Sequence, residues 1–109
     1  MTDDILLKVH GHAGFISLNR PSALHALTLP MVHAMTEALL AWRESDAVKC
    51  VIIDHAEGRG FCAGGDIAFL RNSALNDNGE SGRKFFHDEY QLNHLLFTYP
   101  KPVVAFMDG

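Results

Sequence analysis

The order of apolar and polar residues predicts a β-hairpin followed by a helix. Short apolar runs at residues 5–9 and 15–18 flank a glycine-containing loop at residues 11–14, which is the pattern of two paired strands. From Thr28 onward the apolar positions recur at helical spacing, as on one face of an amphipathic helix. These apolar residues are Met31, Val32, Met35, Leu39 and Trp42. Thr28 fits an N-cap, and Pro30 is tolerated in a first helical turn.

The second half of the chain predicts two strands and a further helix. Residues 50–53 form a continuous apolar run, which is typical of a strand buried on both faces of a parallel sheet. Residues 83–97 have helical periodicity, and the prolines within residues 99–102 end that helix. Residues 103–107 predict another buried strand. The small polar residues 72–82 predict an exposed excursion.

Composition and charge narrow the class of protein. Of the 109 residues, 48% are hydrophobic and 20% are charged, so the chain is a small globular unit rather than a disordered one. With a net charge of −4 and no cluster of Lys or Arg, neither nucleic acid nor a membrane surface is an expected partner. The acidic start at residues 1–4 does not resemble a secretory signal. Cys50 and Cys62 are expected to be free thiols, and we therefore expect a cytoplasmic location.

The segment at residues 61–67, Phe-Cys-Ala-Gly-Gly-Asp-Ile, is the first candidate for chemistry. Gly64 and Gly65 allow a ligand to approach the main chain closely. Asp66 can cap a short helix that begins at Ile67, and the N–H groups ahead of such a helix can bind an anion or an oxyanion. A glycine-rich turn with an ordinary Asp cap explains the same residues. The Gly-Lys-Ser/Thr ending of a nucleotide-binding loop is missing.

Covalent catalysis and metal binding have weaker support. Cys62 is a conceivable nucleophile, but the spacing of the histidines selects no base for it, and a small buried thiol is the favoured role. The histidines considered as its base are His12, His25, His33, His55, His87 and His94. The group of His10, His12 and His25 lacks the spacing of a metal site, so we expect none.

Glu89 is the second candidate, because it falls within an apolar stripe. On a helical wheel it lies on the same face as Phe85, Leu92 and Leu96. The residues expected to flank the same side are Phe86, Tyr90, Asn93 and Phe97. Burying a carboxylate in such an apolar stripe lowers the free energy of unfolding by several kcal/mol unless the carboxylate is paired. Pairing with one of the chain's arginines, a frayed helix end, or a role in a site would each explain it.

Four motifs in register resemble the crotonase (enoyl-CoA hydratase/isomerase) family. They lie at residues 19–21, 26–28 and 60–67, and at 101–105 together with the final Gly109. The resemblance runs from about residue 5 to the end. It implies an α/β fold, the N-terminal half of the crotonase-like spiral, with a mostly parallel sheet flanked by helices in the order βββαβ…αβ. Residues 1–109 would then be the N-terminal portion of a single domain whose C-terminal remainder is absent.

The helix motif at residues 85–93, combined with residues 61–67, looks most like the 3-hydroxyisobutyryl-CoA hydrolases of that family. The resemblance implies that the Gly65 N–H is one donor of an oxyanion hole and that Glu89 lies at the acyl end of the pocket. It implies an acyl-CoA substrate with coenzyme A as part of that substrate, and no permanently bound cofactor. The residues expected along the substrate are Ala26, Leu27, Ala63, Gly64, Asp66 and Ile67. His25 departs from the Asn usual before Ala-Leu.

Three functions remain open on this basis. A CoA-thioester hydrolase is the first, although this segment alone is expected to be inactive. An enoyl-CoA hydratase or isomerase of the same fold is the second. The third is a non-catalytic module that binds CoA or assembles with partners. Because the apolar faces have little to pack against, we expect the chain to associate with the rest of its own polypeptide or with other copies.

Overall fold

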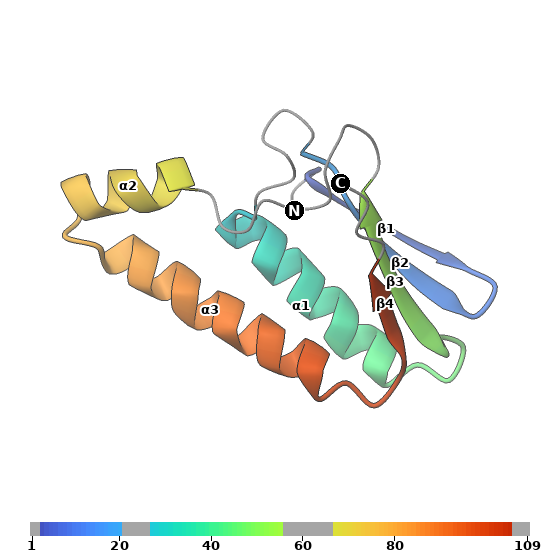
Figure 1. Ribbon diagram of the computed structural model, residues 1–109. Coiled ribbons are helices and arrows are strands. Elements are labelled where there is room, and N and C mark those ends of the chain that lie inside the picture. Colours follow the sequence, from blue (N-terminus) through green and yellow to red (C-terminus); the bar gives the residue numbers. More distant parts are fainter. Residues whose placement is uncertain (1–2, 21–26, 56–66, 106–109) are drawn as a thin grey trace.

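The fold is a four-stranded sheet with helices on one side (Figure 1). The computed structural model describes residues 3–20, 27–55 and 67–105, with side chains from residue 71 onward in the helix that begins at 67. The elements are β1 (Ile5–His10), β2 (Ala13–Leu18), α1 (Leu29–Arg43), β3 (Cys50–His55), α2 (Ile67–Asn76), α3 (Glu80–Phe97) and β4 (Val103–Ala105). The strand order is β1-β2-β3-β4, with β1 antiparallel to β2 and the other neighbours parallel. α1 lies next to the sheet, and α3 packs against α1 (Figure 1).

These elements confirm the predicted α/β class with a mostly parallel sheet. α1 begins as predicted, because the Thr28 hydroxyl accepts a hydrogen bond from the Met31 N–H at 3.3 Å. The apolar face of α1 is buried, and it joins residues of β2, β3 and α3 in one core. In the described residues two strands precede α1, where three were predicted. Residues 21–26 lie outside the described residues, so the third strand stays a prediction.

The hairpin turn is tighter than predicted. His10 pairs directly with Ala13, and Gly11 occupies the turn with a φ of 62°, a conformation that glycine adopts without steric cost. Gly14, which was predicted to lie in the loop, belongs to β2. Its missing side chain makes room for Trp42 of α1, since a Cβ at this position would lie 2.6 Å from Trp42 Cε3.

Gly14→Ala is therefore expected to lower the free energy of unfolding by about 1–3 kcal/mol through overpacking. Urea unfolding of the purified protein measures this loss. In a Trp42→Ala background, Gly14→Ala should change the free energy of unfolding little, because the clashing indole ring is absent. An equal loss in both backgrounds would show that the contact with Trp42 is not the cause.

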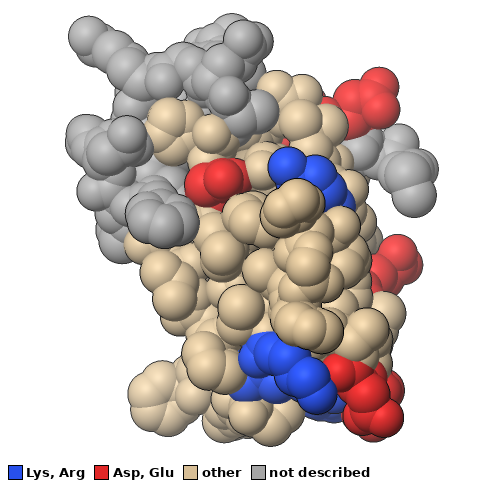
Figure 2. Space-filling view, turned by 90° about the vertical axis from the view of Figure 1, so that its right-hand side faces the viewer, with Lys and Arg blue, Asp and Glu red and all other residues tan. Residues whose placement is uncertain are grey.

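Among the described residues, helices cover only one face of the sheet. In β3, Val51 and Ile53 are buried towards α1, whereas Ile52 on the opposite face is half-buried. In β4, Val104 is exposed. The prediction that these strands are buried on both faces was wrong for the described residues, because no described element packs on the outer face. In the middle of that face Figure 2 shows no Lys, Arg, Asp or Glu.

The corner between α2 and α3 replaces the predicted exposed excursion at residues 72–82. Ser73 is only 3% exposed. Its hydroxyl donates to Asp77 Oδ1 at 2.6 Å and accepts from the Gly82 N–H at 2.8 Å, and the Ser81 hydroxyl also donates to the Asp77 carboxylate. The prediction of exposure holds for most of this segment and was wrong for Ser73 and Gly82, because these small polar groups satisfy one another inside a helical corner. The same bonds let α3 begin earlier than predicted.

Candidate functional site

The predicted site residues divide into those that the structure describes and those that it does not. Leu27, Glu89 and the backbone of Ile67 are described. The residues outside the described ranges are Gly65, Ala26, Ala63, Gly64 and Asp66, together with Cys62 and His25. Their predicted roles stay predictions. α2 begins at Ile67, as the sequence predicted.

Leu27 is held at the entrance to α1. It directly precedes the N-cap Thr28 and packs, partly buried, against the core. The N-cap fixes the direction in which the chain enters the helix, because the Thr28 side chain satisfies one of the free N–H groups of the first turn. The segment predicted to lie along the substrate therefore leads into a rigid helix.

Glu89 lies near the middle of α3 and is half-buried. Phe85 and Leu92 on the same face are fully buried, so the helix turns this face towards α1. Its carboxylate has no hydrogen bond or ion pair with any residue in the described ranges. An arginine partner is therefore not found there, and helix fraying is excluded because α3 continues to Phe97. The carboxylate oxygens are not among the buried polar atoms of the described residues, so contact with water explains this position as a role in a site does.

The aromatic residues predicted to flank the buried stripe are exposed. Phe86, Tyr90 and Phe97 are 55%, 74% and 88% exposed, and Asn93 is exposed as well. Their exposure is consistent with flanking positions, because α3 contacts its neighbours over a narrow arc that contains Phe85. Glu89 therefore lies at the border between the packed face and an uncovered aromatic row.

Asp88 is a feature that the sequence analysis missed. It is 14% exposed, and it accepts hydrogen bonds from His33 Nε2 of α1 at 2.7 Å and from Lys84 Nζ at 2.9 Å. His87 Nδ1 adds a contact at 3.2 Å. These groups, His33 first, hold the pKa of the Asp88 carboxyl far below its usual range. Only the spacing of Lys84 and Asp88 by one helical turn was visible in the sequence.

Acid should destabilise the protein through Asp88 and Asp77. Hydrogen bonds from Ser73 and Ser81 hold the pKa of the Asp77 carboxyl below its ordinary value of 3.8, and the pKa of Asp88 is lowered as well. A carboxyl group whose pKa is lower in the folded than in the unfolded protein stabilises the fold at pH values above its unfolded-state pKa. This stabilisation is lost as the pH falls through the folded-state pKa. We expect the free energy of unfolding to decrease below about pH 4 and to decrease less in Asp88→Asn. Identical pH profiles in urea unfolding would contradict this role of Asp88.

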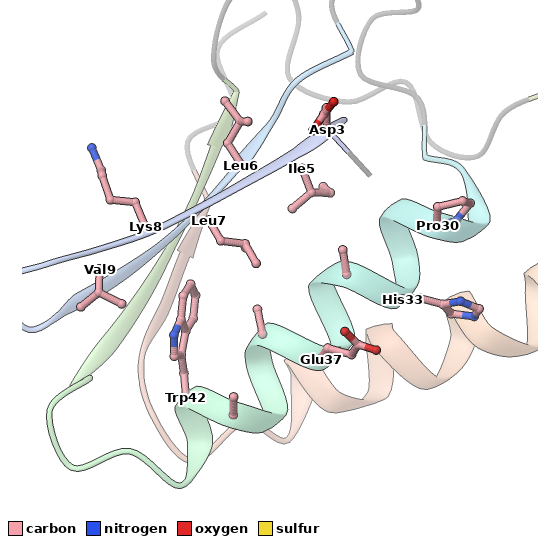
Figure 3. A pocket seen from close by; sticks show the side chains of 13 residues that line it. Asp3, Ile5, Leu6, Leu7, Lys8, Val9, Pro30, His33, Glu37 and Trp42 are labelled. Carbon is pink, nitrogen blue, oxygen red and sulfur yellow. The ribbon is translucent and has the colours of Figure 1, made fainter. Parts of the chain in front are cut away.

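A groove of 1260 Å³ between β1 and α1 is separate from these candidates. Leu7 and Trp42 point into it, Lys8 points away from it, and His33 points towards α3 (Figure 3). Of the predicted site residues whose side chains the structure describes, neither Leu27 nor Glu89 lines this groove.

No metal or membrane feature appears in the described part of the chain. No group of three or more His, Cys, Asp or Glu could hold a metal ion there. No helix in that part is long and apolar enough to cross a membrane. Cys50 is a free, half-buried thiol, and His12 bonds through Nδ1 to the Ala47 carbonyl oxygen at 3.1 Å rather than to a nucleophile.

Comparison with known proteins identifies the family. The sequence profile of the enoyl-CoA hydratase/isomerase family matches residues 13–109, and the chain belongs to that family. The 3-hydroxyisobutyryl-CoA hydrolase of Xenopus tropicalis is 44% identical over 97% of this chain and 27% of its own length. The crystal structure of a carnitinyl-CoA dehydratase from Mycobacterium thermoresistibile matches with a TM-score of 0.93 and 45% identity, over 99% of this chain and 32% of its own.

A third relative has a different role. The small ribosomal subunit protein mS47 of Neurospora crassa is 38% identical over 98% of this chain and 22% of its own length. The chain thus spans about a quarter of the length of these curated relatives. The comparisons confirm the crotonase-type fold, and the high TM-score extends over almost the whole chain.

The comparison also corrects the expected location. The similar hydrolases of Xenopus tropicalis, Xenopus laevis and Rattus norvegicus are mitochondrial proteins, so the expectation of a cytoplasmic location is wrong. It relied on an acidic start and on free thiols. Those features argue against secretion, but they do not distinguish the cytosol from the interior of an organelle.

Proposed function

We propose that this chain supplies the N-terminal part of a site that hydrolyses acyl-CoA thioesters, with 3-hydroxyisobutyryl-CoA as the substrate. The observation that carries the proposal is the half-buried Glu89 carboxylate on α3, which has no partner among the described residues. A carboxylate without such a partner, beside the buried side chains of Phe85 and Leu92, is available to contact a substrate. The identity to the Xenopus tropicalis hydrolase supports the choice of substrate.

In this proposal the Gly65 N–H donates to the thioester carbonyl oxygen. Hydrolysis adds water to the carbonyl carbon, places negative charge on that oxygen, and then expels the CoA thiol to leave a carboxylic acid. A fixed N–H dipole stabilises the charge without a cost of reorganisation. Glu89 orients the acyl group or the attacking water. Ala26, Leu27, Ala63, Gly64, Asp66 and Ile67 lie along the CoA portion of the substrate.

Two alternatives each have an observation in their favour. A hydratase or dehydratase of the same fold is supported by the Mycobacterium thermoresistibile structure, which is as similar to the chain as the hydrolase is. A non-catalytic assembly module is supported by the ribosomal protein mS47. The proposed hydrolase differs from both in needing the Glu89 carboxylate for thioester cleavage.

The test uses a chimaera that carries this chain in full. In the hydrolase chimaera the chain replaces the matching segment of the Xenopus tropicalis hydrolase, which is 27% of that enzyme. Release of free CoA thiol from 3-hydroxyisobutyryl-CoA is followed with a thiol reagent, and folding is checked by circular dichroism. We expect turnover within about 10-fold of the parent enzyme, because the fold of the exchanged segment is shared. A folded chimaera without thiol release would contradict the proposal.

A further inference from the structure

We infer that Asp88 is a positioning residue, whose bond to His33 fixes α3 against α1 and thereby sets the place of the Glu89 carboxylate. This inference rests on the proposed thioester function. The bond joins two helices that are 55 residues apart at these positions, with His33 Nε2 at 2.7 Å from Asp88 Oδ2. Figure 3 shows His33 pointing from α1 towards α3.

The bond between His33 and Asp88 connects the two described parts of the proposed site, which are Glu89 on α3 and the segment that leads into α1. Glu89 is the next residue along α3 after Asp88. His33 lies in the N-terminal part of α1, shortly after Leu27 and the N-cap Thr28. A change in the distance between His33 and Asp88 would therefore move Glu89 relative to the segment that leads into α1.

The opposite ends of the same helices are held by other bonds. The Tyr99 hydroxyl donates to the Leu39 carbonyl oxygen, and Lys101 Nζ donates to the carbonyl oxygens of Trp42 and Ser45. These bonds attach the chain just after α3 to the C-terminal end of α1. With that end fixed, the bond between His33 and Asp88 determines how closely the middle of α3 approaches α1.

Apolar packing does not replace this bond. Phe85 and Leu92 are buried on either side of Asp88 and hold α3 in the core, but hydrophobic contacts are not directional. A hydrogen bond to an ionised carboxylate is short and directional. It therefore defines the position of this turn of α3 more narrowly than the neighbouring side chains do.

The test is a double-mutant cycle in the hydrolase chimaera, with kcat/KM measured per folded molecule. Asp88→Ala is expected to lower kcat/KM about 10-fold, because a small displacement of a catalytic group has effects of this order or larger. In a Glu89→Gln background Asp88→Ala should cause almost no further loss, since the group it positions is already disabled. A merely structural role would lower the folded fraction and leave kcat/KM per folded molecule unchanged in both backgrounds.

Variants of His33 keep the inference testable if Asp88→Ala does not fold. His33→Ala leaves Asp88 bonded to Lys84 and should lower kcat/KM as Asp88→Ala does, whereas His33→Gln retains an N–H donor and should restore part of the activity. Lys84→Gln is the matched control, because Lys84 bonds Asp88 within α3 and does not join the helices. Wild-type kcat/KM in folded His33→Ala would overturn the inference. If Glu89→Gln alone retained full activity, the role of Glu89 in the proposed function would fail as well.

Discussion

Glu89→Gln is expected to lower kcat/KM for thioester hydrolysis by about 100-fold, the usual scale for a positioned acid–base group. Gln preserves the size of the side chain, removes its charge, and replaces one acceptor oxygen by an N–H donor group. The carboxylate is half-buried and has no partner in the described ranges, so its removal should leave stability unchanged or raise it.

The measurement pairs thermal unfolding with thiol release on the same variant of the hydrolase chimaera. Glu80→Gln is the matched control, because Glu80 lies exposed in the first turn of the same helix. It should retain normal turnover. A Glu89→Gln protein that is less stable but has unchanged turnover per folded molecule would make Glu89 a structural ion.

Gly65→Pro is expected to lower kcat by about 100- to 1000-fold, because proline has no N–H to donate to the developing oxyanion. Gly65 lies outside the described residues, so this prediction rests on the motif at residues 61–67 and on the resemblance that it carries. Gly65→Ala keeps the N–H and adds only a methyl group, so we expect it to lower kcat much less than Gly65→Pro does. A nearly normal kcat in a folded Gly65→Pro protein would mean that the segment is only a turn.

Local sequence signals predicted the helices and strands well. The helical spacing that begins after Thr28 gave α1 with its cap, because capping and amphipathicity act within a few residues. The same reasoning failed at Ser73, which was predicted to be exposed because its side chain is polar but is buried. Ser73 is buried because Asp77 and Gly82 satisfy its hydroxyl, and that pairing depends on the angle between two helices.

For the candidate site, the sequence pointed to Glu89 and to the segment at residues 61–67, and the roles of both stay predictions. Glu89 stood out because an acid within an apolar stripe is visible on a helical wheel. The bond between Asp88 and His33 was not predictable, because its partners are 55 residues apart and neither is unusual in its own segment. The one-sided burial of β3 was also missed, since an apolar run does not reveal which elements cover each face.

The most direct test of the hydrolase function compares two chimaeras that carry the same 109 residues. In the first the chain replaces the matching segment of the Xenopus tropicalis hydrolase, and in the second that of the Mycobacterium thermoresistibile dehydratase. The measurement is kcat/KM of each relative to its parent, for 3-hydroxyisobutyryl-CoA hydrolysis and carnitinyl-CoA dehydration respectively. We expect the hydrolase chimaera to retain the larger share, by about 10-fold or more, because the proposed function assigns Glu89 to thioester cleavage. A folded hydrolase chimaera without activity, beside an active dehydratase chimaera, would contradict this account.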